Sequence, residues 1–362
     1  MEVLNMSVIC PVCASENPEV AVACGVCGHR FIAPDPALPA GATLDGGRYT
    51  IERVLGRGGF GITYRARSRH RPVAIKEFFP VDRDLCGRAP GSCNLRPGRE
   101  WEHFELQLRR FLDEANRLHE LHHEHIVPLR DHFEENGTAY LVLDLIDGDS
   151  LAERVGRARY RPDEARALLE PLIGALEYLH GKSLAHLDVK PHNILVKSDG
   201  APVLIDFGLA RDYLSAKTRS IMLDASDGYA AIEQYSADLP RGPWTDVYAL
   251  GATLYFMLAG EIPPNAPALL DGRQLVFSAG FDAGLRETIE AAMRPRAMER
   301  LRDLAAFRAV LAGSVASGGT VRRKDRRSDD CQEPIAFAHH FVDTCLFGAR
   351  GIMVLDIAEL GC

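Results

Sequence analysis

A small set of polar side chains in the middle of the chain has the types and placement that phosphate chemistry needs. Asp188, Asn193 and Asp206 lie on loops that follow apolar runs, within the segments HLDVKPHNIL and LIDFGLAR. Two carboxylates and an amide can supply oxygen ligands to Mg²⁺ and can orient a hydroxyl group. These residue types therefore favour a site at which a metal ion and a hydroxyl group are held together.

A lysine and a glutamate strengthen this interpretation. Lys76 lies in the alternating run PVAIKEF, where a lone lysine usually faces solvent and indicates little. Glu114, in the helical stretch that contains FLDEA, can approach Lys76 as an ion pair. Such a pair would fix the ammonium group against a substrate phosphate.

A glycine-rich run precedes the lysine. The segment LGRGGFGITY contains Gly56, Gly58 and Gly61 in a G-x-G-x-x-G spacing, which is a weak signal by itself. A dinucleotide-binding turn would continue into a helix, whereas ITYRARS continues as a strand. The glycines therefore predict a hairpin turn between two strands. Backbone amides in such a turn can approach phosphate oxygens closely, because no side chains intervene.

The elements that must position these residues change in kind near Gly148. Before it, short β-branched or alternating runs predict strands, with one long helix between them. After it, apolar residues at three- and four-residue spacing predict helices. A small β-rich lobe is therefore expected before a larger α-rich lobe, with a ligand cleft between them. The expected strands are 49–55, 62–68, 72–78 and 138–146, and the expected helices are 104–121, 162–181, 246–260 and 285–293.

These motifs, in this order, resemble the eukaryotic-type protein kinases that also occur in bacteria. The matching elements are the glycine-rich loop, VAIK, the helix glutamate, an HxD loop, DFG and DVYALG, between Tyr49 and Ala312. The resemblance implies an α+β, bilobal protein-kinase-like fold with a β-rich N-lobe and an α-helical C-lobe. It also implies a serine/threonine protein kinase that uses ATP and Mg²⁺ to phosphorylate protein substrates.

The resemblance also assigns a nucleotide site. The backbone of the glycine-rich loop would cover the phosphates, Lys76 would hold the α- and β-phosphates, and Val54 and Ala74 would lie against the adenine. Asp144–Ile146 would form the hinge, with Leu143 behind the adenine. The implied ATP-binding residues are Leu55, Gly56, Gly58, Gly59, Phe60, Gly61, Thr63, Ala74, Lys76, Leu143, Asp144 and Ile146.

The implied catalytic residues follow the same motifs. Asp188 would orient the substrate hydroxyl and accept its proton, and Lys190 would steady the γ-phosphate. Lys190 also matches the serine/threonine form of the catalytic loop. Asn193 and Asp206 would hold Mg²⁺, and Glu114 would pair with Lys76.

The sequence departs from the family pattern in its activation region. Leu187 stands where the family has the arginine that usually receives an activation-loop phosphate, so control by phosphorylation of that loop is in doubt. The APE motif is AIE, whose Glu233 is expected to pair with Arg300. Thr63 replaces the valine that roofs the adenine. Ser226 replaces the threonine that closes the activation segment, and the candidate autophosphorylation sites are Ser215, Thr218 and Ser220.

The connection between Lys76 and Glu114 is about twenty residues longer than in a compact family member. The excess, residues 80–98, is predicted to be a surface loop. Its Cys86 and Cys93 are interpreted as loop thiols without a metal, with a third metal-binding pair as the alternative.

Two CxxC pairs near the start of the chain predict a metal site. Cys10 and Cys13 are separated by ten residues from Cys24 and Cys27, and four thiolates in two such turns suit tetrahedral Zn²⁺. Residues 8–31 therefore resemble a zinc ribbon, with a redox CxxC or chance as the alternatives. Cys10–Phe31 carries few basic residues, which favours contact with a protein partner or a structural role over nucleic-acid binding.

Composition divides the rest of the chain. The sequence predicts a Pro/Ala/Gly-rich linker at 32–48, the kinase domain at 49–312, a flexible basic linker at 313–334 and a C-terminal tail of undetermined structure at 335–362. The tail is apolar but interrupted by charged and histidine residues, which makes membrane insertion costly. No segment predicts a membrane span or a secretory leader.

The overall figures are those of a globular protein. The 362 residues include 42 Lys and Arg against 50 Asp and Glu, which gives a formal net charge of −8, with 46% hydrophobic residues. This acidic balance gives no strong signal for nucleic-acid binding. Paired cysteines without a leader favour a reducing compartment, the cytoplasm.

Two alternatives to an active kinase stay open at this stage. One is a pseudokinase scaffold that binds nucleotide, although Lys76, Asp188, Asn193 and Asp206 are all present. The other is an adaptor that acts through its zinc ribbon and tail.

Overall fold

The structure is a computed structural model. Some residues to which the sequence assigns a role lie outside the part that it describes, and their assigned roles remain predictions. They are Cys10, Gly59, Phe60, Ser215, Thr218, Ser220, Ser226 and residues 313–362. The described residues are 7–9, 12–18, 24–27, 36–58, 61–69, 71–80, 86–88, 92–98, 100–207, 211–212, 228–236, 238–278 and 281–312.

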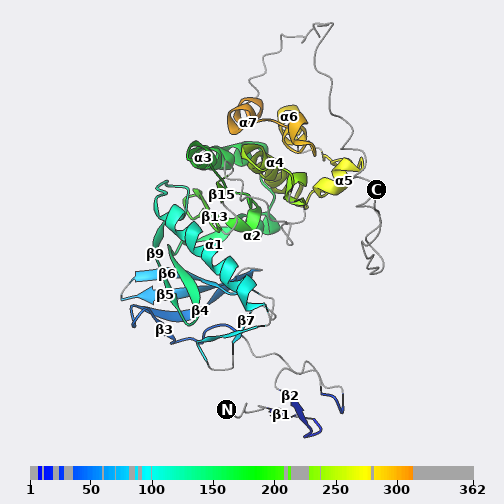
Figure 1. Cartoon of the computed structure of the whole chain (residues 1–362). Coiled ribbons are helices and arrows are strands. Elements are labelled where there is room, and N and C mark those ends of the chain that lie inside the picture. Colours follow the sequence, from blue (N-terminus) through cyan, green and yellow to red (C-terminus); the bar gives the residue numbers. More distant parts are fainter. Residues whose placement is uncertain are drawn as a thin grey trace, which may run out of the picture. The chain divides into compact units, whose positions relative to one another are not determined.

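An antiparallel sheet forms the core of the first lobe (Figure 1), and its strand order is β3-β4-β5-β6-β10-β9. In β6 the side chains alternate between the two faces of the sheet: Val73 and Ile75 are buried, whereas Ala74 and Lys76 are half-buried. The four strands predicted from alternation are confirmed, and β9 is an additional strand. The bounds are β3 Thr43–Leu44, β4 Tyr49–Gly58, β5 Gly61–Ser68, β6 Arg71–Phe78, β9 Leu129–Glu135 and β10 Thr138–Asp144.

One long helix, α1 (Trp101–His119), packs against this sheet. Its buried side chains recur at helical spacing, and Phe104 and Phe111 each place their rings 5.3 Å from the ring of Phe78 in β6. The helix predicted for 104–121 is therefore confirmed, and aromatic contacts join it to the strand that carries Lys76.

The opposite side of β6 is covered by two segments for which the sequence predicted no packing. Residues 36–44, which we call the strap, lie within the predicted linker, yet Leu38 and Leu44 are buried in the core of the sheet. The insert at 80–98 contributes a hairpin of β7 (Cys86–Arg88) and β8 (Leu95–Pro97). The prediction of a surface loop is wrong for this hairpin, because the side chain of Cys86 is only 1% exposed.

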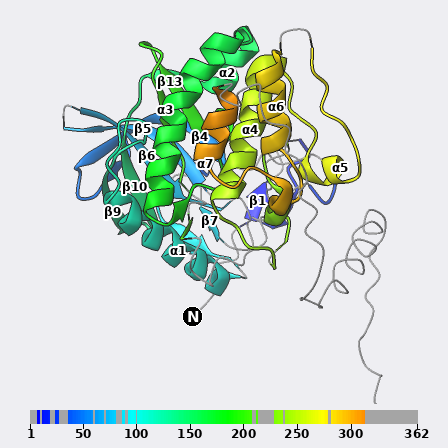
Figure 2. The same cartoon turned by 90° about the horizontal axis from the view of Figure 1, so that it is seen from above.

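The second lobe is mainly helical, as predicted, and its longer helices pack side by side (Figure 2). Helix α4 is buried along almost its whole length; it begins with Pro243 after Gly242 and ends at Gly260, whose φ of +71° suits glycine. The helices are α2 Leu151–Arg157, α3 Pro162–Gly181, α4 Pro243–Ala259, α5 Ala266–Leu270, α6 Ala283–Ala292 and α7 Leu304–Leu311.

Short elements complete the described part. Single 3₁₀ turns lie at Pro191–Asn193, Ile232–Gln234 and Ala297–Glu299. None of the helices within the described residues is long and apolar enough to cross a membrane. The remaining strands are β1 Ser7–Ile9, β2 Glu16–Pro18, β11 Gly148–Ser150, β12 Leu184–Ala185, β13 Ile194–Lys197, β14 Pro202–Leu204 and β15 Arg211–Asp212.

Candidate active site

The lysine of the sheet lobe reaches the aspartate of the DFG motif. Lys76 Nζ forms an ion pair with Asp206 Oδ1, and 12% of the Lys76 side chain is exposed against 40% of the Asp206 side chain. The contact joins residues that are 130 positions apart in the chain. Glu114 lies in α1, but its side chain is outside the described part, so its predicted pairing with Lys76 stays a prediction.

The catalytic loop holds Asp188 between an amide and an ammonium group. Asn193 Nδ2 donates to Asp188 Oδ2 at 2.7 Å and to the Asp188 carbonyl at 2.9 Å. Lys190 Nζ lies 2.9 Å from Asp188 Oδ2. The carboxylate is therefore oriented by two partners, an amide and an ammonium group.

A hairpin brings the two predicted metal ligands to the same end of a sheet. Ile194, directly after Asn193, pairs with Leu204, and the Ile205 amide donates to the Asn193 carbonyl at 2.9 Å. Asp206 follows at once. Asn193 uses Nδ2 toward Asp188, and its Oδ1 is the acceptor of the amide, so an amide oxygen and a carboxylate lie at the same end of this sheet.

A buried carboxylate of α4 fixes the backbone of this loop. Asp246 Oδ2 accepts from the His186 amide at 2.9 Å, and Oδ1 accepts from the Leu187 amide at 2.7 Å. His180 Nε2 lies 2.8 Å from Asp246 Oδ2. Burial alone would raise the pKa of Asp246, but the hydrogen bond from His180 and the nearby imidazoles and amide outweigh it and lower the pKa.

Two further groups shape the loop around Leu187. The Leu187 side chain is buried where the family has an arginine, and its φ is +63°. Gln234 Nε2 donates to the Leu187 carbonyl at 2.8 Å. Burial lowers the pKa of His186, so this imidazole is neutral near neutral pH.

These supporting residues were not assigned from the sequence. DVYALG matches the family pattern as a string, and its first residue, Asp246, is the acceptor that fixes the catalytic loop. An aspartate inside an otherwise apolar helix is a signal that could have indicated this role, because a buried carboxylate needs hydrogen-bond partners.

The predicted ion pair between Glu233 and Arg300 lies in the interior of the helical lobe. Arg300 Nη1 and Nη2 lie 2.8 and 3.2 Å from the two carboxylate oxygens of Glu233. Thr245 Oγ1 also donates to Glu233 Oε1 at 2.9 Å. Three backbone carbonyls accept the remaining Arg300 donors, those of Trp244, Arg294 and Pro295.

The described residues predicted to contact adenine lie near Lys76. Register pairs Thr63 with Lys76 and Leu143 with Ala74, so these side chains share the face of the sheet that carries Lys76. Thr63, Ala74, Leu143, Asp144 and Ile146 are all half-buried, whereas Leu55, Gly56 and Gly58 are exposed in β4. At Gly61, an added Cβ would collide with the backbone carbonyl of Glu77, so the turn into β5 requires glycine.

The cysteine segment forms a cluster of sulfur atoms. The ligand atoms of Cys13, Cys24 and Cys27 all lie within 4.8 Å of one another. The Ser15 hydroxyl lies 3.0 Å from the sulfurs of Cys13 and Cys24. This hydroxyl, followed by the backbone amide of Cys27, lowers the pKa of the Cys24 thiol to about 5 against the opposing effect of burial.

Comparison with known proteins identifies the class of this chain. A family model described as the protein kinase domain matches residues 49–274. The serine/threonine-protein kinases D and C of Synechocystis sp. are each 30% identical to the chain over 287 and 285 residues. These matches cover 75% of this chain and 53% and 50% of the relatives, so the chain spans about half of their length. The solved structure named PpkA-294 apo form is 29% identical, with a TM-score of 0.65, and the match covers 76% of this chain and all of that one.

The chain therefore belongs to the protein kinase family. Its kinase domain is of the serine/threonine type, and membership implies that it uses ATP and Mg²⁺. The residues present fit that ion, because the carboxylate of Asp206 and the amide oxygen of Asn193 are the hard oxygen donors that Mg²⁺ prefers.

Proposed function

We propose that the whole protein is an active serine/threonine kinase that phosphorylates itself and other proteins. The arrangement that carries the proposal is the set of contacts around Asp188, with Lys190 and Asn193 on its carboxylate and Asp206 at the adjacent strand end. In a pseudokinase scaffold there would be no need to keep these groups together. Ser215, Thr218 and Ser220 are the proposed autophosphorylation sites, with Ser226 closing the activation segment.

In the proposed reaction the protein supplies positioning and charge. Asp188 orients the acceptor hydroxyl and takes its proton, and Lys190 neutralises charge on the transferred phosphoryl group. Lys76 holds the other phosphates, with Glu114 as its proposed partner. Asn193 and Asp206 would hold Mg²⁺, which neutralises phosphate charge when it is bound.

The nucleotide is proposed to lie against the face of the sheet that carries Lys76. Val54, Ala74 and Leu143 would enclose the adenine, and Asp144–Ile146 would supply the hinge. The glycines of the loop between β4 and β5 would cover the phosphates with backbone amides. The domain is proposed to extend to residue 312, because α6 and α7 pack on α4 and α3 beyond the matched residues.

Transfer of the γ-phosphoryl group from labelled ATP to a generic protein acceptor tests the proposal. We expect label on serine or threonine, and a rate lowered at least roughly 100-fold in Lys76→Met, because a cation on the phosphates is lost. Arg157→Met is the control, since this exposed residue pairs with Asp149 on the surface. Nucleotide binding without transfer by the wild type would favour the scaffold instead.

We further propose that residues 8–31 form a zinc ribbon, with Cys10 as the fourth ligand beside Cys13, Cys24 and Cys27. The support is the thiol cluster and the lowered pKa of Cys24, because the thiolate is the form that binds a metal. The ribbon would contact a protein partner. Thiolate ligands also favour a reducing compartment, which we propose to be the cytoplasm.

Zinc content of the purified full chain tests the ribbon. We expect about one zinc ion per chain, and its loss in Cys24→Ser, because a serine hydroxyl is a poor replacement for a thiolate ligand. Cys93→Ser is the matched control, because this thiol lies in the β7–β8 insert, far along the chain from the cluster. Zinc retained in Cys24→Ser, or absent from the wild type, would contradict the proposal.

A further inference from the structure

A buried carboxylate lies directly beside Lys76 in the chain, on the other face of the sheet. Glu77 pairs with Tyr140 of β10 and with Ile62 of β5, and its side chain shares the face that carries Ile75 and Tyr64. Glu77 is 0% exposed. Charged side chains are almost never fully buried without a partner, so this position depends on its neighbours.

Both oxygens of Glu77 are satisfied by the surrounding side chains. The hydroxyl of Tyr64 donates to Oε2 at 2.7 Å, and that of Tyr140 donates to Oε1 at 2.9 Å. Arg88 supplies the compensating charge, with Nη1 3.2 Å from Oε2 and Nη2 in contact with Oε1. Burial is the main cause that raises the pKa values of the Tyr64 and Tyr140 hydroxyls, and the negative charge of Glu77 raises them further. Both hydroxyls therefore stay protonated and donate.

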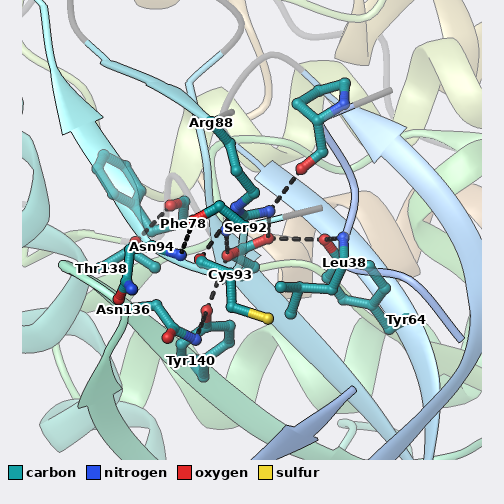
Figure 3. A network of polar contacts seen from close by, with 12 residues as sticks. Leu38, Tyr64, Phe78, Arg88, Ser92, Cys93, Asn94, Asn136, Thr138 and Tyr140 are labelled. Carbon is teal, nitrogen blue, oxygen red and sulfur yellow. Dashed lines mark hydrogen bonds and ion pairs between the residues drawn. The ribbon is translucent and has the colours of Figure 1, made fainter. Parts of the chain in front are cut away.

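Arg88 joins this carboxylate to two other parts of the chain (Figure 3). Its side chain is only 2% exposed. Nε donates to the Cys93 carbonyl at 3.1 Å within the hairpin insert, and Nη1 donates to the Pro36 carbonyl of the strap at 2.5 Å. The guanidinium group also lies over the ring of Phe79, 5.1 Å from its centre. One guanidinium therefore links strand β6, the hairpin and the strap.

The strap is bound to the same network. The Leu38 amide donates to the Tyr64 hydroxyl at 3.0 Å, and that hydroxyl in turn donates to Glu77. Further along, the Gly41 amide donates to the Ile51 carbonyl at 2.8 Å. The strap is thus attached to the sheet through the partners of Glu77. Glu77 is the residue that directly follows Lys76 in β6.

The hairpin leads directly into the helix that carries Glu114. The Leu95 amide donates to the Asn136 carbonyl at 2.8 Å, and the chain then enters α1, where Trp101 stacks on Phe104 at 4.4 Å between ring centres. The insert therefore connects the strand of Lys76 to the helix of Glu114. Its attachment acts beside the direct contacts of Phe104 and Phe111 with Phe78, which also join α1 to β6.

We propose that Arg88 is a positioning residue for the kinase site, which fixes β6 to the hairpin ahead of α1 and to the strap. This inference rests on the proposed kinase function. Arg88 contacts Glu77 on the face of the sheet opposite Lys76, so it acts through Glu77 and through the hairpin on Lys76 and α1.

The test compares Arg88→Met with wild type in the full chain. We expect KM for ATP to rise roughly tenfold, since small displacements of phosphate-binding groups are costly, while KM for a peptide acceptor stays within about twofold. Phe307→Leu, in the buried core of α7, is the control for general destabilisation. An unchanged KM for ATP in Arg88→Met would overturn the proposal.

A second variant separates positioning from stability. Arg88→Met leaves Glu77 buried without its cation, which is strongly destabilising, whereas Glu77→Met with Arg88→Met removes both charges and is expected to recover the unfolding midpoint. We expect the double variant to keep the raised KM for ATP, because the links to Pro36 and Cys93 are still missing. Recovery of both the midpoint and KM would show that Arg88 is only structural.

Hydrogen exchange and nucleotide binding complete the test. In the double variant we expect faster amide exchange in residues 36–44 and in α1 together, with the helical lobe unchanged; faster exchange confined to the hairpin would contradict the proposal. Affinity for a fluorescent ADP reports on Lys76 without any transfer. A wild type that binds ADP but transfers nothing would refute the kinase proposal, while the effect of Arg88 on ADP affinity could still be measured.

Discussion

Replacing Asp188 with asparagine is expected to lower kcat for phosphoryl transfer by roughly 10³-fold, since a positioned general base contributes about 10²–10⁴-fold. The substitution keeps an oxygen that can accept from Asn193 Nδ2 but removes the negative charge that pairs with Lys190. The acceptor hydroxyl would then lose both its orientation and its proton acceptor. Binding of ATP should change by no more than about twofold, because Asp188 is proposed to act on the acceptor.

Initial rates with a peptide acceptor and titration of a fluorescent nucleotide measure these two quantities separately. His192→Asn is the matched control, because His192 lies in the same loop with an exposed side chain. A kcat within tenfold of wild type would show that Asp188 is not the base. If the protein instead acts as an adaptor, cells that carry Asp188→Asn should keep the wild-type phenotype.

Replacing Arg300 with methionine is expected to destabilise the protein by about 3–5 kcal/mol, the cost of leaving a buried charge without its partner. Glu233 is 3% exposed and Arg300 is fully buried. The hydroxyl of Thr245 would be the remaining side-chain donor to Glu233 in the described part of the lobe, and it cannot supply a charge. Three backbone carbonyls would lose donors as well.

The denaturant midpoint of the helical lobe, followed by circular dichroism, measures this effect. Arg157→Met is a comparison on the surface, where the partner is Asp149 and the expected loss is below about 1 kcal/mol. The double variant Glu233→Met with Arg300→Met should recover most of the stability. Equal losses in the buried and the surface variants would contradict a role for the pair in the core.

Local patterns were sufficient to predict the main elements. Alternation in PVAIKEF matches the burial of Val73 and Ile75, and three- and four-residue spacing matches the helices α1, α3, α4 and α6. These patterns succeed because each element buries one face against a neighbouring layer. The catalytic loop residues followed from motif order, and the structure places Asp188, Asn193 and Asp206 close to one another.

The packing of the strap and the insert over the face of the sheet that carries Glu77 could not be predicted in the same way. The insert and the strap lack periodicity, and their positions depend on a contact between Arg88 and Glu77 that no local rule encodes. The sequence does contain one signal of this packing. Glu77 occupies the same phase of the alternation as Val73 and Ile75, so a charged side chain lies at a position where the pattern predicts an apolar one. A carboxylate in that phase needs polar partners from elsewhere in the chain, here Arg88, Tyr64 and Tyr140.

The backbone of the site has a consequence for the order in which the protein folds. Leu187 and Asp206 have φ values of +63° and +62°, a left-handed conformation that costs roughly 1–3 kcal/mol at each non-glycine residue. Leu187 is held there by Asp246 of α4, which lies 246 − 187 = 59 residues later in the chain. During synthesis the catalytic loop therefore leaves the ribosome well before the helix that stabilises it. A nascent chain has the sheet and its lysine early, but the backbone of the catalytic loop gains its hydrogen bonds to Asp246 only after α4 has emerged and packed.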